Sequence, residues 1–149
     1  MTELYFDHEQ LEQLLAETVF RGERLTVSGC GNSMAPFICE QTDRVVLAPL
    51  TKRTRKAGNI CLYKRPNGQL VMHRICRIHG GLCDMRGDNQ LYIEHDVAQC
   101  QLLAQVVQVI RPKQTVRCDT VRARLRWRYG TLRCFAARIR NRLLKKKRG

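Results

Sequence analysis

The chain has 149 residues, of which 27% are charged and 44% hydrophobic, a mix that is ordinary for one globular domain. No apolar run approaches the roughly 20 residues that a membrane-spanning helix needs, so we expect no such helix. The net charge is +14, but the distribution of charge excludes a chain that is basic all over. Residues 1–110 hold 12 basic and 12 acidic side chains, whereas residues 111–149 hold 15 basic ones and a single acid, Asp119. The composition therefore indicates a neutral body with a basic tail.

The N-terminal residues are acidic and lack the basic and apolar regions of a secretory signal. We therefore expect a cytoplasmic protein. None of the eight cysteines forms a C-x-x-C pair, and most of them lie in apolar stretches. This pattern predicts reduced, buried thiols and no metal site, because a zinc site needs paired ligands at short spacing.

The first elements in chain order are a helix and a strand. Residues 8–20 carry leucine and valine at helical spacing, and Gly22 is placed to end a helix there. Asp7 is placed to cap its N-terminus. Residues 24–28 alternate between polar and apolar side chains, which predicts a strand, and a glycine-rich turn follows it.

The middle of the chain is a series of short β-like runs. The turn signals P-N-G and G-G separate some of them. The runs lie at residues 45–47, 60–63, 69–78, 82–85 and 100–110, and Pro112 ends the last one. We therefore expect a mainly β body made of antiparallel strands.

The tail has a different pattern. From about residue 116, apolar residues step by three or four between arginines, which predicts a basic amphipathic helix, or two helices parted at Gly130. We divide the chain into an N-terminal helix (residues 1–22), a β domain (residues 23–112) and a helical tail (residues 113–149).

Two residues of the body have the chemistry of a catalytic pair. Ser33 follows the glycine-rich turn and precedes a proline, so its hydroxyl is expected to be exposed beside backbone N–H groups. A serine hydroxyl needs an adjacent base to become a nucleophile. His73, in the middle of an expected strand, has the right pKa range for that role. Taken alone, Ser33 is equally a turn residue and His73 equally a core residue.

Five short segments raise the catalytic interpretation above these alternatives. Residues 33–36 (S-M-A-P) resemble the S-M-x-P nucleophile box of signal peptidases and of the related self-cleaving repressors. The family's later boxes are matched in order by residues 43–46 (D-R-V-V), 57–63 (A-G-N-I-C-L-Y), 73–75 (H-R-I) and 87–89 (G-D-N). The resemblance covers roughly residues 25–110, and it departs from the pattern at Asn59, where the family has Asp.

The resemblance implies a fold of bent antiparallel sheets and a serine endopeptidase that removes a leader or signal-like segment from a precursor. Ser33 would be the nucleophile and His73 the general base, in place of the lysine of most bacterial members. The substrate would be extended, carry small residues before the cleaved bond and lie along residues 24–28. No cofactor is implied.

A histidine base needs an acid to orient its ring. The resemblance implies Asp88 of the G-D-N box, as orienter or as structural support, with Glu94 and Asp96 as reserves. For the oxyanion, it implies the backbone N–H of Ser33. Gly31 stands where many members have a hydroxyl, so a second donor must come from elsewhere, such as Asn32.

Other interpretations remain open. A self-cleaving repressor is disfavoured because only about 25 residues precede the body, too few for a helix-turn-helix domain, and because those proteins use lysine. A catalytically inactive β module is a second alternative. The tail has the pattern of a helix that lies on the cytoplasmic face of an anionic membrane, but it also fits a helix docked on the body, a nucleic-acid-binding segment or a helix that fills a partner's groove.

Overall fold

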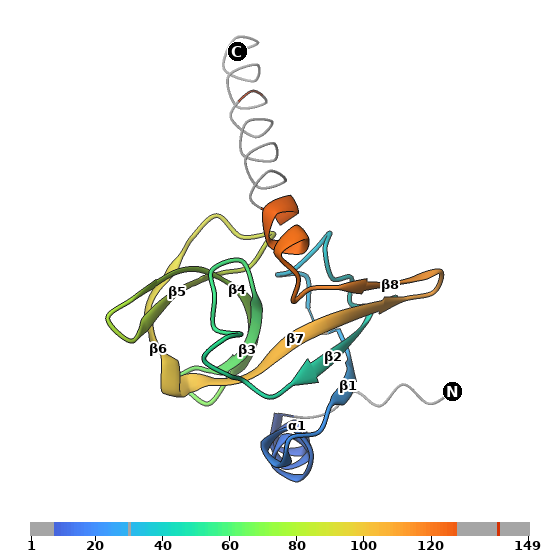
Figure 1. The fold of residues 1–149 in the computed structure, drawn as a ribbon, viewed down its shortest axis with the longest axis horizontal. Coiled ribbons are helices and arrows are strands. Elements are labelled where there is room, and N and C mark those ends of the chain that lie inside the picture. Colours follow the sequence, from blue (N-terminus) through green and yellow to red (C-terminus); the bar gives the residue numbers. More distant parts are fainter. Residues whose placement is uncertain (1–7, 30, 128–139, 141–149) are drawn as a thin grey trace.

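The structure, a computed structural model, describes residues 8–29, 31–127 and 140 (Figure 1). Helix α1 (His8–Glu17) leads into a short 3-10 turn, η1 (Val19–Arg21), and Gly22 ends it with a left-handed backbone at φ 97°. The predicted N-terminal helix is therefore present, with its last turn tightened. The capping residue expected at position 7 lies outside the described residues.

One antiparallel sheet forms the body, which confirms the mainly β fold class. Its strand order is β1-β2-β7-β3-β4-β5-β6, with β8 added on β7. The bounds are β1 (Leu25–Ser28), β2 (Arg44–Ala48), β3 (Ile60–Lys64), β4 (Leu70–His79), β5 (Leu82–Arg86), β6 (Glu94–Ala98), β7 (Leu102–Arg111) and β8 (Gln114–Arg117), and a short 3-10 turn, η2 (Gln99–Gln101), precedes β7. Strand β7 is the central one, because β2 pairs along one of its edges and β3 and β8 share the other.

Of the three apolar clusters of the described residues, the two larger ones both receive side chains from β3, and the third is small and holds Val46, Ala48 and Val107. Successive side chains of a strand point to opposite faces. Ile60 and Leu62 accordingly join a cluster with α1, β1, β2 and β7, whereas Cys61 and Tyr63 join a second cluster with β4, β5 and β6. In Figure 1 the strands β3 to β6 form a curled group on the left, and β2 and β8 lie along opposite edges of the other half of β7.

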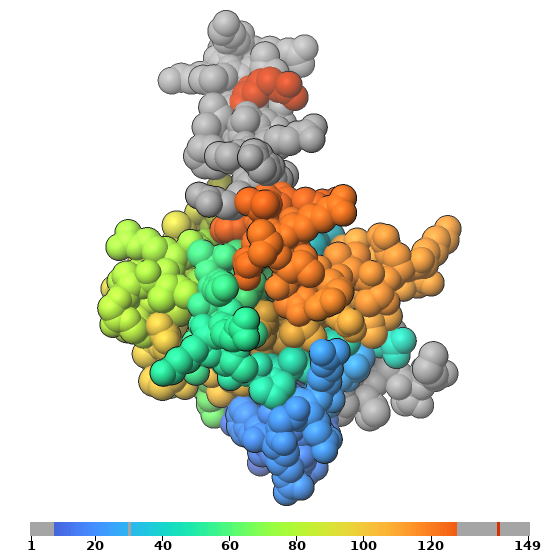
Figure 2. All heavy atoms as spheres, in the orientation of Figure 1, coloured from blue at the N-terminus to red at the C-terminus, as the bar shows by residue number. Residues whose placement is uncertain are grey.

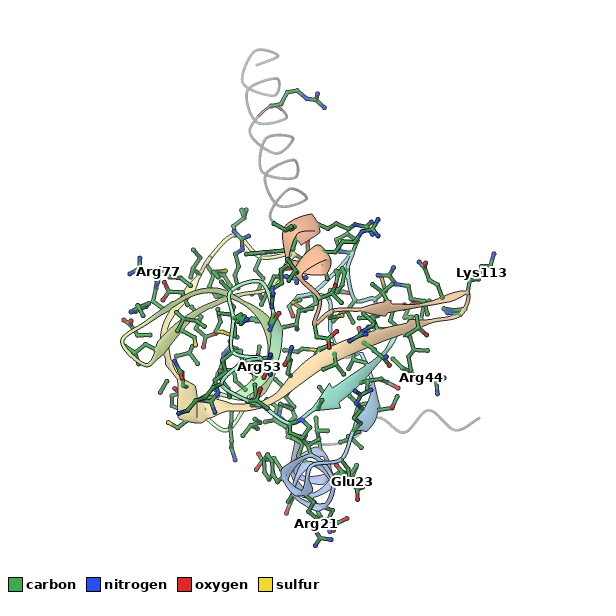
Figure 3. The ribbon with its side chains drawn as sticks, in the orientation of Figure 1. Arg21, Glu23, Arg44, Arg53, Arg77 and Lys113 are labelled. Atoms are coloured by element: carbon green, nitrogen blue, oxygen red, sulfur yellow. The ribbon has the colours of Figure 1, made fainter. Side chains whose placement is uncertain are left out.

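Two strands were not predicted. Strand β6 begins with Glu, His and Asp, residues that are depleted in strands or carry no strand preference, so its pairing with β5 is a tertiary effect. Strand β8 lies beyond Pro112, and it corrects the predicted boundary of the β domain from residue 112 to residue 117. Pro112 does end β7, but Pro112 and Lys113 then form a two-residue turn that reverses the chain; Figure 3 shows Lys113 at the tip of this hairpin.

Helical residues 121–127 begin the predicted tail helix and rest on the body. The added Cβ of an alanine at Gly58 would lie 3.1 Å from Arg124 Cγ and 3.4 Å from Trp127, so the helix packs closely there (Figure 2, orange). Val121 and Leu125 of the apolar stripe remain 62% and 48% exposed. Most of the tail, residues 128–139 and 141–149, lies outside the described residues. Among the helices that the structure describes, none combines the length and the apolar character needed to cross a membrane.

Candidate active site

Ser33 and His73 line the same cavity, which has a volume of about 320 Å³. Much of the wall is apolar and comes from Leu11, Val27, Leu47, Leu62, Leu70 and Met72. Within the described part of the chain, the Ser33 hydroxyl has no hydrogen-bond partner, so it is available to a molecule in the cavity. Serine–base contacts in ligand-free enzymes are often long and tighten when substrate binds.

The G-D-N loop (residues 87–89) holds the turn that carries Ser33 through hydrogen bonds to its backbone. The backbone N–H of Asn89 donates to the Ser33 carbonyl over 2.9 Å, and the Asn89 side chain donates to the Asn32 carbonyl over 3.2 Å. Gly87 approaches so closely that an added Cβ would lie 2.6 Å from the Ser33 carbonyl oxygen. The loop therefore needs glycine at position 87, because any side chain there would push the Ser33 turn away.

His73 is placed by strand β4, opposite Cys61 of β3, and its side chain is only about 1% exposed. Its Nδ1 atom lies 3.1 Å from the hydroxyl of Tyr63. That hydroxyl in turn donates to Glu94 Oε2 over 2.5 Å. The imidazole is therefore joined to a carboxylate through a buried tyrosine.

Arg65 completes this chain of contacts. Its guanidinium donates to both oxygens of Glu94, with distances of 2.8 to 3.2 Å. These hydrogen bonds lower the pKa of Glu94, so the carboxylate is ionised and can only accept hydrogen bonds.

The number of protons available fixes the tautomer of His73. Tyr63 has one hydroxyl proton and gives it to Glu94, so its oxygen must accept from His73 Nδ1–H. In the neutral imidazole the other nitrogen, Nε2, is then unprotonated and basic. Burial, with the charges of Glu94 close by, raises the pKa of Tyr63, which keeps it a phenol.

The pKa of His73 is about 4, below its ordinary value of 6.5. Burial is the main cause because it penalises the charged ring, and the positive charge of Arg65 adds to the effect. The imidazole is therefore neutral near pH 7, which is the form that a general base requires.

Asp88 has a different partner. Arg74 donates hydrogen bonds to both carboxylate oxygens of Asp88, over 2.9 and 2.6 Å, and a third to the carbonyl of Gly58. The guanidinium of Arg74 lies against the rings of Phe37 and Trp127, at 5.0 and 5.3 Å. Of its two predicted roles, Asp88 thus has the structural one: it ties the loop that supports Ser33 to strand β4.

The two reserve acids are separated in the structure. Glu94 is the acid connected to His73, through Tyr63. Asp96 is exposed and lies 3.7 Å from His79, in a different group of side chains. Sequence analysis missed Tyr63 and Arg65. The predicted hairpin of residues 60–63 and 69–78 could have indicated Tyr63. Side chains alternate along each strand, and in this hairpin Tyr63 lies on the same face of the sheet as His73.

Side-chain amides also line the cavity. Asn32, named above as a source of the second oxyanion donor, is one of them, and so is Gln90, which was not predicted. The Oε1 atom of Gln90 is buried against Gly87 and lacks a hydrogen-bond partner within the described residues. Asn59, the departure from the family's Asp, does not line the cavity; its side chain donates to the Thr54 carbonyl.

The described cysteines match the predicted pattern in part. Cys61, Cys83 and Cys118 are buried free thiols, whereas Cys100 is exposed. Burial raises the pKa of Cys61 to about 12 and that of Cys118 to about 11. Both thiols are therefore unreactive packing residues near pH 7.

Neither models of protein families, nor curated proteins, nor solved structures give a match to this chain. The resemblance to signal peptidases therefore stays a prediction from the motifs.

Proposed function

We propose that the chain is a serine endopeptidase of the signal-peptidase type that cleaves a leader or signal-like segment from a peptide or protein precursor. One observation carries this proposal. Ser33 and His73, on separate elements, line one cavity, and the tautomer of His73 leaves Nε2 as the basic nitrogen. A serine and an oriented neutral imidazole that line one cavity supply the two groups that nucleophilic catalysis requires.

In the proposed reaction, Ser33 Oγ attacks the carbonyl carbon of the cleaved peptide bond while His73 Nε2 takes the hydroxyl proton. The tetrahedral intermediate collapses when His73 returns this proton to the leaving amine, which leaves an ester on Ser33. Water then attacks the ester and gives a proton to His73. His73 passes this proton to Ser33 Oγ as the ester bond breaks, and the acid product departs. The backbone N–H of Ser33 would stabilise the oxyanion in both halves of the reaction.

The proposed substrate is an extended peptide. Strand β1 ends one side of the sheet, and the chain runs from its last residue, Ser28, directly to the turn of Ser33. A peptide that pairs with β1 would add a strand and reach the nucleophile. The apolar wall of the cavity, with Val27 and Leu47 beside Ser28, favours a small aliphatic side chain next to the cleaved bond.

A fluorophosphonate probe tests the proposal without knowledge of the natural substrate. We expect one covalent adduct per chain, located on Ser33 by peptide mass spectrometry, and no adduct in Ser33→Ala. Ser28→Ala is the matched control: because Ser28 carries a second hydroxyl in the same cavity, an adduct on Ser33 that persists in this variant excludes Ser28 as the labelled residue. His73→Gln should slow labelling about a hundredfold or more, the scale of a lost general base.

Two outcomes would overturn the assignment. One is labelling that persists in Ser33→Ala, and the other is a folded wild-type chain that neither the probe nor a peptide boronic acid modifies. The chain would then be an inactive β module.

A second proposal concerns the tail: we infer that it binds an anionic membrane surface. The observation that favours this is the exposure of Val121 and Leu125, one helical turn apart, beside Arg122 and Arg126. Apolar side chains in a basic helix insert into the interface, and each basic residue near an anionic surface contributes about 1 kcal/mol.

Flotation with vesicles tests the tail. The full chain should float with vesicles that contain phosphatidylserine and not with vesicles of phosphatidylcholine alone. Removal of residues 128–149 should weaken flotation, because it takes away nine of the 14 basic residues of the tail while Val121 and Leu125 remain. The cut must fall there and not at residue 113, because β8 and the buried Cys118 belong to the body. Unchanged flotation after truncation, or retention on DNA in its place, would contradict the membrane proposal.

A further inference from the structure

A second group of reactive side chains lies on the strands β4, β5 and β6, outside the cavity that Ser33 and His73 line. His79 is the last residue of β4, Asp84 is in the middle of β5, and His95 and Asp96 are neighbours on β6. None of the four lines the cavity. Cysteine spacing gave no sign of this group, because none of its four members is a cysteine.

An irregularity in the pairing of β5 with β6 brings the group together. Cys83 pairs with Val97 and Met85 pairs with Glu94, so one residue of β5, Asp84, faces two residues of β6. This is the two-against-one count of a β-bulge. In a regular strand His95 and Asp96 would point to opposite faces, but here His95 Nδ1 lies 3.2 Å and the Asp96 N–H 3.4 Å from Asp84 Oδ1.

The spacing of the side-chain atoms fits a metal centre. His79 Nε2 lies 3.1 Å from Asp84 Oδ1 and 3.7 Å from Asp96 Oδ1, and the ligand atoms of these three residues all lie within 4.8 Å of one another. Metal–ligand bonds of about 2.0–2.2 Å in a tetrahedral site place neighbouring ligand atoms about 3.3–3.6 Å apart. Small side-chain rotations would therefore bring these atoms round one ion.

The charge of the group calls for a cation. The Asp84 side chain is 90% buried, with a relative exposure of 10%, and within the described residues it has no ion pair with lysine or arginine. Arg77 is its cross-strand neighbour, but Figure 3 shows the Arg77 side chain extending away from the sheet. Buried carboxylates are normally paired with a cation or bound to a metal. Two carboxylates and two neutral imidazoles would balance the charge of a divalent ion.

We propose that His79, Asp84, Asp96 and His95 bind a divalent transition-metal ion, with zinc as the best fit. Imidazole ligands select the transition metals over magnesium and calcium, which prefer oxygen ligands alone. Asp96 and His95 lie at the surface, so the ion can enter from solvent.

The ion would also stabilise the relay, that is, the hydrogen bonds that join His73 to Tyr63 and Tyr63 to Glu94. Glu94, which holds Tyr63 and through it His73, directly precedes His95 on β6. A metal that joins β4, β5 and β6 would hold Glu94 in register, in the way that groups behind a site orient those within it. This consequence depends on the proposed peptidase function, whereas metal binding itself does not.

Equilibrium dialysis of the full chain against Zn²⁺, followed by metal analysis, tests the site. We expect one equivalent of bound zinc and at least a tenfold rise in Kd for both His79→Ala and His95→Ala. His8→Ala and Cys100→Ser are controls for binding by other histidines and by the exposed thiol, and they should not change Kd. Ser33→Ala should bind zinc like the wild type, which separates this test from the peptidase proposal.

Cobalt substitution gives a second readout. Co²⁺ bound at this site should show the intense visible absorption of a tetrahedral complex without a sulfur charge-transfer band, and Asp84→Asn should remove it. Because Asp84 is buried, circular dichroism should check that this variant folds; the exposed His95 supplies a variant that is expected to fold. Less than half an equivalent of zinc, or a Kd that neither histidine variant changes, would overturn the proposal.

Discussion

The loop at residues 87–90 and strand β6 each bring one carboxylate toward strand β4, and the two are used differently. Asp88 of the loop pairs with Arg74, on the side of β4 that faces Phe37 and Trp127. Glu94 of β6 reaches the neighbouring residue, His73, through Tyr63. Adjacent residues of a strand point to opposite faces, so the two acids cannot serve the same group.

The contacts of the two acids show which of them is joined to His73. Asp88 belongs to a recognisable motif, yet its contacts support the Ser33 turn. Glu94 belongs to no motif of the body, yet the hydrogen bonds of the base end on it. Substitutions at the two acids should therefore separate stability from catalysis.

The largest expected effect is on stability, at Asp88. Asp88→Asn would leave the Arg74 guanidinium, about 4% exposed, without its charge partner. Loss of one partner of a buried ion pair costs about 3–5 kcal/mol. Urea denaturation should show a fall in the free energy of unfolding at the low end of this range, because Asp88 itself is 12% exposed. Glu94→Gln should cost about 1 kcal/mol, and an equal loss in the two variants would remove the distinction.

The next effect is on catalysis, at Tyr63. Tyr63→Phe removes the hydroxyl that holds His73 Nδ1 and leaves the Glu94–Arg65 pair in place. With the tautomer no longer fixed, the rate of fluorophosphonate labelling should fall about a hundredfold. The free energy of unfolding should change by only about 1–2 kcal/mol, the scale of one buried hydrogen bond. A labelling rate within threefold of wild type would show that the relay does not orient the base.

A smaller effect is expected where the loop meets the Ser33 turn. Gly87→Ala places a methyl group against the Ser33 carbonyl, and relief of such overpacking costs about 1–3 kcal/mol. Since the turn must move, labelling should slow about tenfold, while zinc binding by the proposed site on β4, β5 and β6 stays unchanged. Gly68→Ala, in a turn with open space around it, is the control. Its φ of +86° strains an alanine and lowers stability too, but this variant should label normally because nothing near it is displaced. Normal labelling of Gly87→Ala would mean that the turn tolerates displacement.

The smallest effect is the response to pH. With a His73 pKa of about 4, the labelling rates at pH 5.5 and pH 7.5 should agree within about twofold, whereas an ordinary pKa of 6.5 would make them differ about tenfold. The same shift has a defined sign for stability. The unfolded chain binds more protons than the folded one between pH 6.5 and pH 4, so the contribution of His73 to stability is complete above this window and is lost as the pH falls through it. Labelling and urea denaturation across this range measure both.

The sequence by itself determined the local elements. Helical spacing at Leu11 to Val19, alternation in the β runs and the P-N-G turn predicted α1 and six of the eight strands. The strand bounds agree within two residues, whereas α1 ends three residues before the predicted residue 20. These signals are short-range, because periodicity and turn chemistry depend on neighbouring residues. They also placed Ser33 in a turn and His73 in a strand, and the motifs linked the two.

Which side chains contact one another depends on the tertiary fold and could not be read from the sequence. Strand β6 has a polar sequence, so neither its pairing with β5 nor the bulge that turns His95 and Asp96 toward Asp84 could be predicted. The choice of Glu94 over Asp88 as the acid behind His73 also depends on register across three strands. Register is set by the packing of residues far apart in the chain, and that information is not local.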